Sequence, residues 1–222
     1  MSNQIQDAYI VKAVRTPVGK VRGAFGHTRP DDLLAHVLKG VMKDTPELND
    51  RIEDVIVGCA MPEAEQGMNI GRIGVLLAGL PDTVPAVTIN RFCSSGSQAV
   101  AMAADKIRLG EADVMIAAGT ESMSMVPMMG NKIAMNSKVF QDDNVAIAYG
   151  MGITAEKVAE QWNVSRDAQD IFATESNRRA IQATENGWFK EEIIPYETET
   201  TFQVPGALEL ATVKRMIEND EG

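Results

Sequence analysis

The sequence is short of cysteine, of positive charge and of long apolar runs, and each shortage excludes a class of protein. Its 222 residues include only two cysteines, too few for a disulfide framework, so a reducing cytoplasm is the expected compartment. The net charge of −10 at pH 7 argues against broad nucleic-acid binding. No apolar run approaches the ~20 residues of a membrane-spanning helix, and the first residues lack the basic flank and apolar core of a secretory signal.

What is present is an alternation of short apolar segments with helical ones. The length allows one large domain or two small ones. Strands are predicted at residues 8–14, 54–60, 87–90 and 113–119, and helices are predicted from about residue 31, at 71–80, from 93 to 109, at 154–162 and from 165 to 186. This alternation predicts an α/β fold with a mainly parallel sheet and helices on its faces. Residues 200–220 give no clear assignment.

Cys93 is the residue best placed for covalent chemistry. It follows a predicted buried strand and a two-residue turn, and it opens an Ala-rich helix that ends before Gly110. A helix N-terminus presents unpaired N–H groups and partial positive charge, and both stabilise the thiolate, which is the nucleophilic form. The Ser-Ser-Gly that follows admits close approach and offers backbone donors to an oxyanion. Free cysteines are also often buried and inert, so spacing alone leaves both roles open.

The other candidates carry weaker signals. Cys59 lies inside a predicted buried strand and is expected to be a core residue. His27 lies in a glycine-rich loop, and His36 falls off the apolar stripe of its helix, where it is expected to face solvent. Either imidazole could in principle act as a base, but neither lies in a motif that suggests one.

The segments NRFCSSGSQA, EADVMIAAGTESMS and VRTPVGKVRGAF resemble three motifs of the thiolases. NRFCSSGSQA around Cys93 is similar to the family's nucleophile motif N-x-x-C-S/G-S-G-x-Q/R-A. EADVMIAAGTESMS resembles the family's G-D/E-A-D segment through G-x-E-S-M-S, and VRTPVGKVRGAF resembles the R-T-P opening. The serines after Cys93 and the glutamine at position 98 resemble the degradative branch, the 3-ketoacyl-CoA thiolases.

The resemblance implies a fold and a division into domains. Thiolase halves are layered βαβαβαββ units that pack around a pair of central helices, and a mostly helical loop domain is inserted in the first half. It implies residues 1–120 as the N-terminal α/β half with an incomplete sheet, residues 121–222 as part of the coenzyme A-covering loop domain, and no second half. Met151 matches the methionine that lines the thiolase active site beside the thioester, although Gly150 stands where the biosynthetic branch often has histidine.

The resemblance also implies a reaction. It is the cleavage of a 3-ketoacyl-CoA by coenzyme A, through an acyl-enzyme on Cys93, in fatty acid β-oxidation. Coenzyme A is then a substrate, with no permanently bound cofactor and no metal. Expected partners are acyl-CoA thioesters, a second copy or three further copies of the chain, and a multienzyme β-oxidation complex, with no nucleic acid or membrane span.

The family's later motifs do not occur within these 222 residues. They are N-E-A-F, the G-H-P histidine and the C-x-G cysteine, which supply general acid/base catalysis, so the activity of this chain alone is open. The alternatives are an acetoacetyl-CoA thiolase or another condensing enzyme of the superfamily, and a non-catalytic thiolase-like binding or assembly protein.

Overall fold

The computed structural model describes residues 5–43, 45–203 and 208–221. The chain divides into two compact units. The first combines Met1–Asn131 with Glu192–Gly222, and the second is Lys132–Glu191. The predicted boundary of the loop domain at residue 120 does not coincide with these units and stays a prediction.

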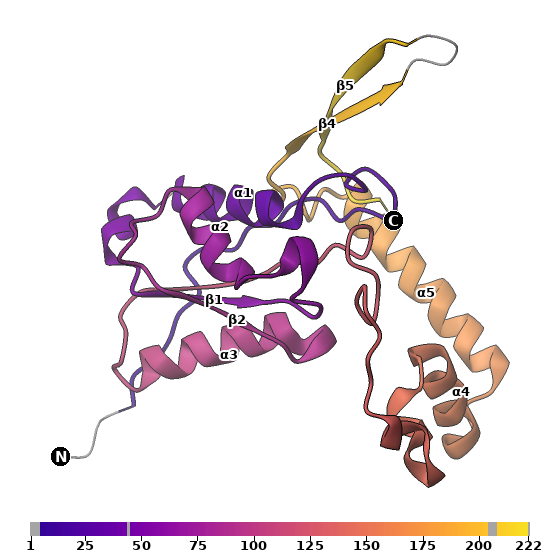
Figure 1. Ribbon diagram of the computed structural model, residues 1–222. Helices are drawn as coiled ribbons and strands as arrows, with labels where there is room; N and C mark the ends of the chain where they lie inside the picture. The colour runs from indigo at the N-terminus through magenta and orange to yellow at the C-terminus, as the bar shows by residue number, and fades with distance from the viewer. Residues whose placement is uncertain (1–4, 44, 204–207, 222) are drawn as a thin grey trace. The chain divides into compact units, whose positions relative to one another are not determined.

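A three-stranded parallel sheet forms the centre of the first unit. Its strands are β1 (Asp54–Gly58), β2 (Ala86–Ile89) and β3 (Met115–Gly119), in the order β2-β1-β3 (Figure 1). The central strand is the most apolar, and Val55, Ile56 and Val57 are completely buried. A strand that is covered on both faces has a continuous run of apolar residues. The sequence D-V-I-V-G therefore predicted this strand correctly.

Helices cover both faces of this sheet, as the alternation predicted. Helices α1 (Pro30–Lys43) and α2 (Ile70–Ala78) lie on one face, and α3 (Ser95–Arg108) lies on the other (Figure 1). Successive side chains of a strand point to opposite faces. Val55 and Val57 accordingly pack in the cluster with α1 and α2, and Ile56 packs against Ala99 and Ala103 of α3.

Residues 8–14 were predicted to form the first strand, and that prediction is wrong for this structure. They lie outside any strand ladder, and Ile10 and Val11 are 79 % and 75 % exposed. A strand requires a neighbour for its backbone hydrogen bonds. The segment is instead held near its ends. Gln6 donates from its backbone N–H to the Arg108 carbonyl at 3.1 Å, and Arg15 forms a single bridge to Ile193.

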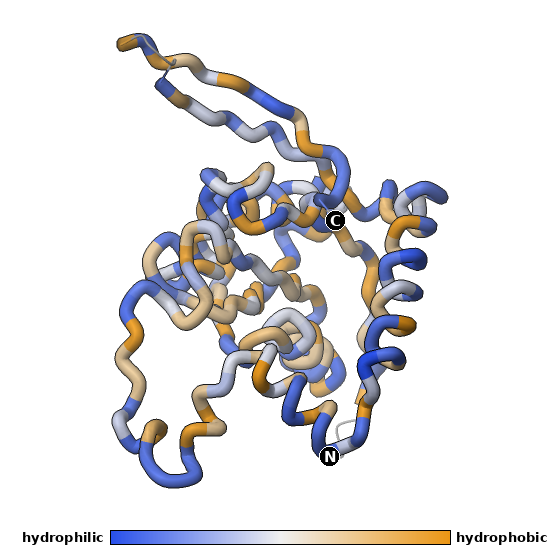
Figure 2. The backbone as a smooth tube through the Cα atoms, turned by 90° about the vertical axis from the view of Figure 1, so that its right-hand side faces the viewer, coloured by the Kyte–Doolittle hydropathy of each residue, from blue (hydrophilic) through white to orange (hydrophobic). Residues whose placement is uncertain are grey.

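Residues 200–220, which the sequence left unassigned, include most of an antiparallel hairpin. Strand β4 (Tyr196–Gln203) pairs with β5 (Leu210–Ile217), from Tyr196 opposite Ile217 to Gln203 opposite Leu210. Hydrophilic and hydrophobic residues are mixed along both strands (Figure 2), and most of these side chains are exposed. No clean two-residue alternation exists here, so periodicity could not find the strands.

The second unit consists of short turns and two helices. The 3₁₀ segments Ser137–Phe140 and Asp142–Ala148 precede α4 (Met151–Trp162) and α5 (Arg166–Glu185). Ser165 caps α5 as predicted, because its hydroxyl accepts the Ala168 N–H at 3.2 Å. No helix within the described ranges has both the length and the apolar character needed to cross a membrane. The first unit also contains the 3₁₀ segments Pro46–Arg51, Ala64–Gln66 and Phe92–Ser94.

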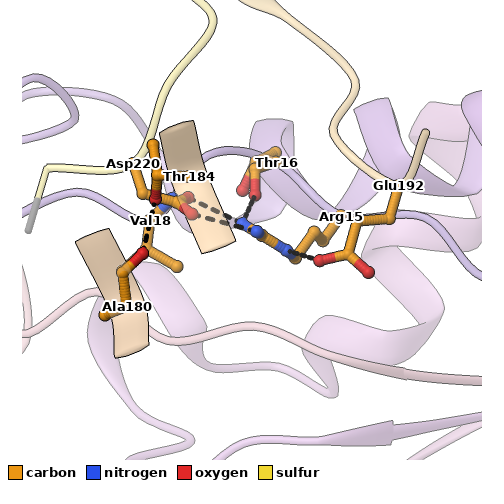
Figure 3. A network of polar contacts seen from close by, with 7 residues as sticks. All are labelled: Arg15, Thr16, Val18, Ala180, Thr184, Glu192 and Asp220. Atoms are coloured by element: carbon orange, nitrogen blue, oxygen red, sulfur yellow. Dashed lines mark hydrogen bonds and ion pairs between the residues drawn. The ribbon is translucent and has the colours of Figure 1, made fainter. Parts of the chain in front are cut away.

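Arg15 of the R-T-P motif joins parts of the first unit that are far apart in sequence. Its guanidinium donates to both carboxylate oxygens of Asp220, at 2.6 and 2.9 Å, and to Glu192 at 2.7 Å (Figure 3). Asp220 also accepts the Val18 N–H at 2.7 Å. The hydrogen bond from Arg15 is the main reason that the pKa of Asp220 is lowered. The segment after residue 15 is therefore anchored to both flanks of the hairpin.

We expect the Asp220→Asn substitution to destabilise the fold by about 1 kcal/mol at pH 7, because it removes a two-pronged charged contact. The lowered pKa means that this stabilisation is present above the ordinary aspartate pKa of about 3.9 and disappears as the pH falls through the lower folded-state pKa. Urea unfolding from pH 7 to pH 2 measures it. The control is Glu218→Gln, an equal charge change at a nearby exposed side chain; equal curves for the two variants would contradict the role of Asp220.

Candidate active site

Cys93 lies in the turn between β2 and α3, and its side chain is exposed. This segment is one turn of 3₁₀ helix, Phe92–Ser94, and α3 begins at Ser95. The α-helix thus starts two residues later than predicted. Ser95 explains the start, because its hydroxyl accepts the Arg91 N–H at 2.9 Å and donates to the Phe92 carbonyl at 2.7 Å. Only one face of α3 is buried, and its buried residues are Ser95, Ala99 and Ala103.

The turn before the thiol has an unusual backbone. Phe92 has a φ of +47°, which non-glycine residues seldom adopt and which costs of the order of 1–3 kcal/mol. Asn90 compensates by bonding both sides of the turn. Its side-chain oxygen accepts the Phe92 N–H at 2.8 Å, and its amide donates to the Ala60 carbonyl at 2.9 Å. The asparagine of the N-R-F-C sequence therefore holds the turn that presents Cys93.

Gly58, at the end of β1, allows the start of α3 to pack directly against the sheet. A Cβ atom on Gly58 would lie 2.5 Å from the Ser95 carbonyl carbon and 2.7 Å from the Gly96 nitrogen, closer than atoms can approach. By contrast, a Cβ on Gly96 would meet nothing within 4 Å. The close contact at Gly58 was not predicted, and the prediction that the Ser-Ser-Gly segment admits another group stays a prediction, with open space beside Gly96. A glycine ending a buried strand was the available signal, and the sequence reasoning missed it.

A buried amide connects the loops that follow β1 and β3. Gln66 is completely buried and donates to Glu121 at 2.6 Å and to the Met61 carbonyl at 2.8 Å, while its oxygen accepts the Ser122 N–H at 2.5 Å. Glu121 in turn accepts the Ala60 N–H at 2.6 Å. This network reaches Asn90 through the Ala60 peptide, so three strand-end loops are tied together next to the Cys93 turn.

The two thiols have different surroundings. Cys59 is 1 % exposed, which confirms the core prediction, although β1 ends one residue before it at Gly58. Burial, with a smaller contribution from the Glu121 charge, raises the pKa of the Cys59 thiol to about 11. A thiol that is buried and protonated at neutral pH is a poor nucleophile. Cys93 is thus the accessible one of the two.

The remaining sequence candidates lie at separate places. Met151 is the first residue of α4 in the second unit and is 67 % exposed. His27 is exposed in the glycine-rich loop. His36 was predicted to face solvent, but it is only partly exposed. Its Nε2 lies 3.0 Å from the Pro195 carbonyl oxygen, and its ring packs edge-on against Tyr196, with 4.9 Å between the ring centroids. The helical period could not show this contact, because Tyr196 is distant in sequence.

Fold and site together define a class: layered α/β proteins in which an accessible cysteine stands at the junction of a parallel strand and a helix start. Comparison with known proteins identifies the family. Residues 8–212 match the family model for the thiolase N-terminal domain. The chain is 48 % identical over 198 residues to the 3-ketoacyl-CoA thiolase of Bacillus subtilis, and the aligned region covers 89 % of this chain and 50 % of that protein. It is 42 % identical to the 3-ketoacyl-CoA thiolase of Vibrio parahaemolyticus, covering 89 % and 50 %.

A solved structure agrees. The crystal structure of the Bacillus anthracis acetyl-CoA acetyltransferase superposes with a TM-score of 0.78 at 32 % identity, over 99 % of this chain and 56 % of that one. The chain belongs to the thiolase family and matches its N-terminal domain. It spans about half the length of the curated relatives that it matches.

We expect Gly58→Ala to destabilise the fold by about 1–3 kcal/mol, because the new methyl group collides with backbone atoms that cannot rotate away. Gly96→Ala is the matched control. It adds the same methyl group two residues into the neighbouring helix, in open space, and should stabilise the fold by about 0.4–1 kcal/mol. Urea denaturation of both variants measures the difference, and the same shift in both would show that the contact at Gly58 is unimportant.

The two cysteines should react at very different rates with a thiol reagent. In the native protein at pH 8 we expect one thiol to be labelled rapidly, and the second only after unfolding, because Cys59 is both buried and protonated. Cys93→Ala should remove the rapid phase, and Cys59→Ala should leave it. A rapid phase that survives in Cys93→Ala would contradict the assignment.

Proposed function

We propose that this chain provides the nucleophile-bearing part of a 3-ketoacyl-CoA thiolase, with Cys93 as the residue that carries the acyl group. The observation that carries the proposal is the accessible thiol of Cys93, held by Asn90 and Ser95 just before α3 in a chain of the thiolase family. The names of relatives that are up to 48 % identical support the choice of 3-ketoacyl-CoA as substrate.

The reaction proceeds in two steps. The Cys93 thiolate attacks the C3 carbonyl of the 3-ketoacyl-CoA, the C2–C3 bond breaks, and the electron pair remains on C2, which takes a proton as acetyl-CoA leaves. The shortened acyl group is then a thioester of Cys93. The thiolate of a second coenzyme A attacks this thioester, and the Cys93 sulfur departs with the bonding pair, which regenerates the enzyme.

The chain's own groups have limited roles in this scheme. The Cys93 backbone N–H is a candidate oxyanion donor, and such a donor is worth about 10²–10³ in rate. Met151 lines the acyl thioester, by analogy with the family. The general acid and base, worth about 10²–10⁴ in rate, come from the portion of the relatives' length that this chain does not span.

A second candidate is the acetoacetyl-CoA thiolase reaction, or another condensation of the superfamily. The likeness to the Bacillus anthracis acetyl-CoA acetyltransferase favours it, although at lower identity than the 3-ketoacyl-CoA thiolases. The same Cys93 acyl-enzyme serves both, so the two candidates differ in the acyl chain accepted. Comparing Cys93 acylation by short and long 3-ketoacyl-CoA substrates separates them.

The setting that we propose is fatty acid β-oxidation in the cytoplasm, as a homodimer or homotetramer and in contact with a multienzyme β-oxidation complex. Two unpaired cysteines fit a reducing compartment. Association is supported by the edge strand β2 and by apolar side chains near the Cys93 turn, since Phe92 is 64 % exposed and Val100 is 47 % exposed.

Mass spectrometry of the chain after incubation with a 3-ketoacyl-CoA tests the nucleophile directly. We expect one acyl group on the peptide that contains Cys93, release of that group on addition of coenzyme A, and no acyl group in Cys93→Ala. Cys59→Ala should still be acylated. Folded wild-type chain that is never acylated, and never turns over substrate, would overturn the proposal and favour a non-catalytic binding or assembly protein.

A further inference from the structure

Gln66 is a buried polar side chain outside the three thiolase-like motifs. It ends the 3₁₀ segment Ala64–Gln66, in the loop after β1, and is completely buried. Most glutamines are exposed, because a buried amide loses its hydrogen bonds to water and needs protein partners instead. The partners of Gln66 come from the loops after β1 and β3, which lie next to the Cys93 turn.

Backbone groups fix the amide of Gln66 in one orientation. Its nitrogen donates to the Met61 carbonyl at 2.8 Å and lies 3.5 Å from the Cys59 sulfur. Its oxygen accepts the Ser122 N–H at 2.5 Å. Because Met61 and Ser122 contribute main-chain atoms, they cannot turn away as side chains can. The 2.6 Å hydrogen bond from the Gln66 nitrogen to the Glu121 carboxylate therefore has one fixed direction.

Glu121 is the group that this fixed amide controls. Glu121 is an exposed residue, and an exposed carboxylate readily exchanges a protein donor for water. One of its oxygens accepts the Gln66 amide, and the other accepts the Ala60 N–H at 2.6 Å. Gln66 thus selects the orientation of Glu121 in which the Ala60 peptide is held.

The Ala60 peptide carries this restraint to the Cys93 turn. Its carbonyl accepts the Asn90 amide at 2.9 Å, and the Asn90 oxygen accepts the Phe92 N–H at 2.8 Å. Phe92 has a φ of +47°, and a residue in such a conformation keeps it only when surrounding contacts impose it. Cys93 is the next residue, so a change at Asn90 moves the thiol.

We propose that Gln66 is a positioning residue for Cys93. It acts through Glu121, the Ala60 peptide and Asn90, which together keep the Cys93 turn in one conformation. The inference rests on the proposed role of Cys93 as the nucleophile. A displacement of about 1 Å in a reacting group can cost about 10² in rate. Loss of the Gln66 amide therefore slows acylation of Cys93 without removing the thiol.

Gln66→Met tests the proposal, because methionine has a similar length and shape but cannot bond to Glu121 or to the Ser122 N–H. Val126→Ala is the matched control. Val126 is also completely buried, lies four residues after Ser122, and has a side chain without polar atoms. Both substitutions destabilise the same region, but only Gln66→Met removes hydrogen bonds that lead to Asn90. Circular dichroism establishes that each variant is folded.

Amide hydrogen exchange, followed residue by residue by NMR spectroscopy, measures the restraint. In Gln66→Met we expect the Ala60 and Phe92 amides to exchange about tenfold faster than in the wild type, as when one hydrogen bond is lost. In Val126→Ala both amides should exchange at the wild-type rate. Unchanged exchange of the two amides in folded Gln66→Met, or equal acceleration in both variants, would overturn the proposal.

Gln66→Glu replaces Gln66→Met if the latter does not fold. The new carboxyl retains an oxygen for the Ser122 N–H, and the titratable groups that face it in the described structure are Glu121 and the Cys59 thiol. It donates to Glu121 only when protonated, and two carboxylates at this distance repel each other. Relative to the wild type at the same pH, the Phe92 amide should exchange faster at pH 8 and equally at pH 5. A ratio that is the same at both pH values would overturn the proposal.

The kinetics of two reactions of Cys93 separate position from reactivity. We expect Gln66→Met to slow acylation by a 3-ketoacyl-CoA about tenfold, but to change alkylation by iodoacetamide less than about twofold, because a small reagent needs access rather than orientation. An equal loss in both reactions would contradict a positioning role. Wild-type chain that is never acylated would count against the proposed function alone, and hydrogen exchange would still decide the role of Gln66.

Discussion

The contact between Gly58 and the start of α3 is the constraint on which the arrangement of the site depends. β1 is buried on both faces, and the helix that follows Cys93 begins directly over the end of this strand. A side chain at position 58 would push the helix outward and move the Cys93 turn with it. Gly119 at the end of β3 lies under the same helix start, with its Cβ position 4.0 Å from the Gly96 Cα. Two glycine-terminated strands thus form the floor of the candidate site.

The features that the sequence predicted correctly are those with a local cause. The buried run V-I-V, the alanine-rich helix after Cys93 and the Ser165 cap each depend on neighbours within a few residues. The failures depend on distant partners. Residues 8–14 have the composition of a strand, yet a ladder also needs a neighbour. His36 was placed on the exposed face of its helix, and a tyrosine 160 positions later in the chain packs against it.

The thiolase-like motifs serve different physical purposes. The N-R-F-C sequence builds a strained turn that presents a thiol, and Glu121 of the E-S-M-S motif holds the Ala60 peptide beside that turn. The R-T-P motif has no part near Cys93 in the described contacts; Arg15 instead clamps Glu192 and Asp220, at the two flanks of the hairpin. A resemblance in motif therefore indicates the family, but only the contacts separate residues that serve the chemistry from residues that close the fold.

Strand β3 links these two purposes. It ends at Gly119 and leads into Glu121, so this strand supports the turn that presents Cys93. Local stability follows local burial and pairing, and an edge strand with half-buried residues opens more easily than a central one. Opening of β3 would therefore also loosen the contacts of Gly119 and Glu121 that support the Cys93 turn. The stability of this strand and the position of the candidate nucleophile are thus coupled.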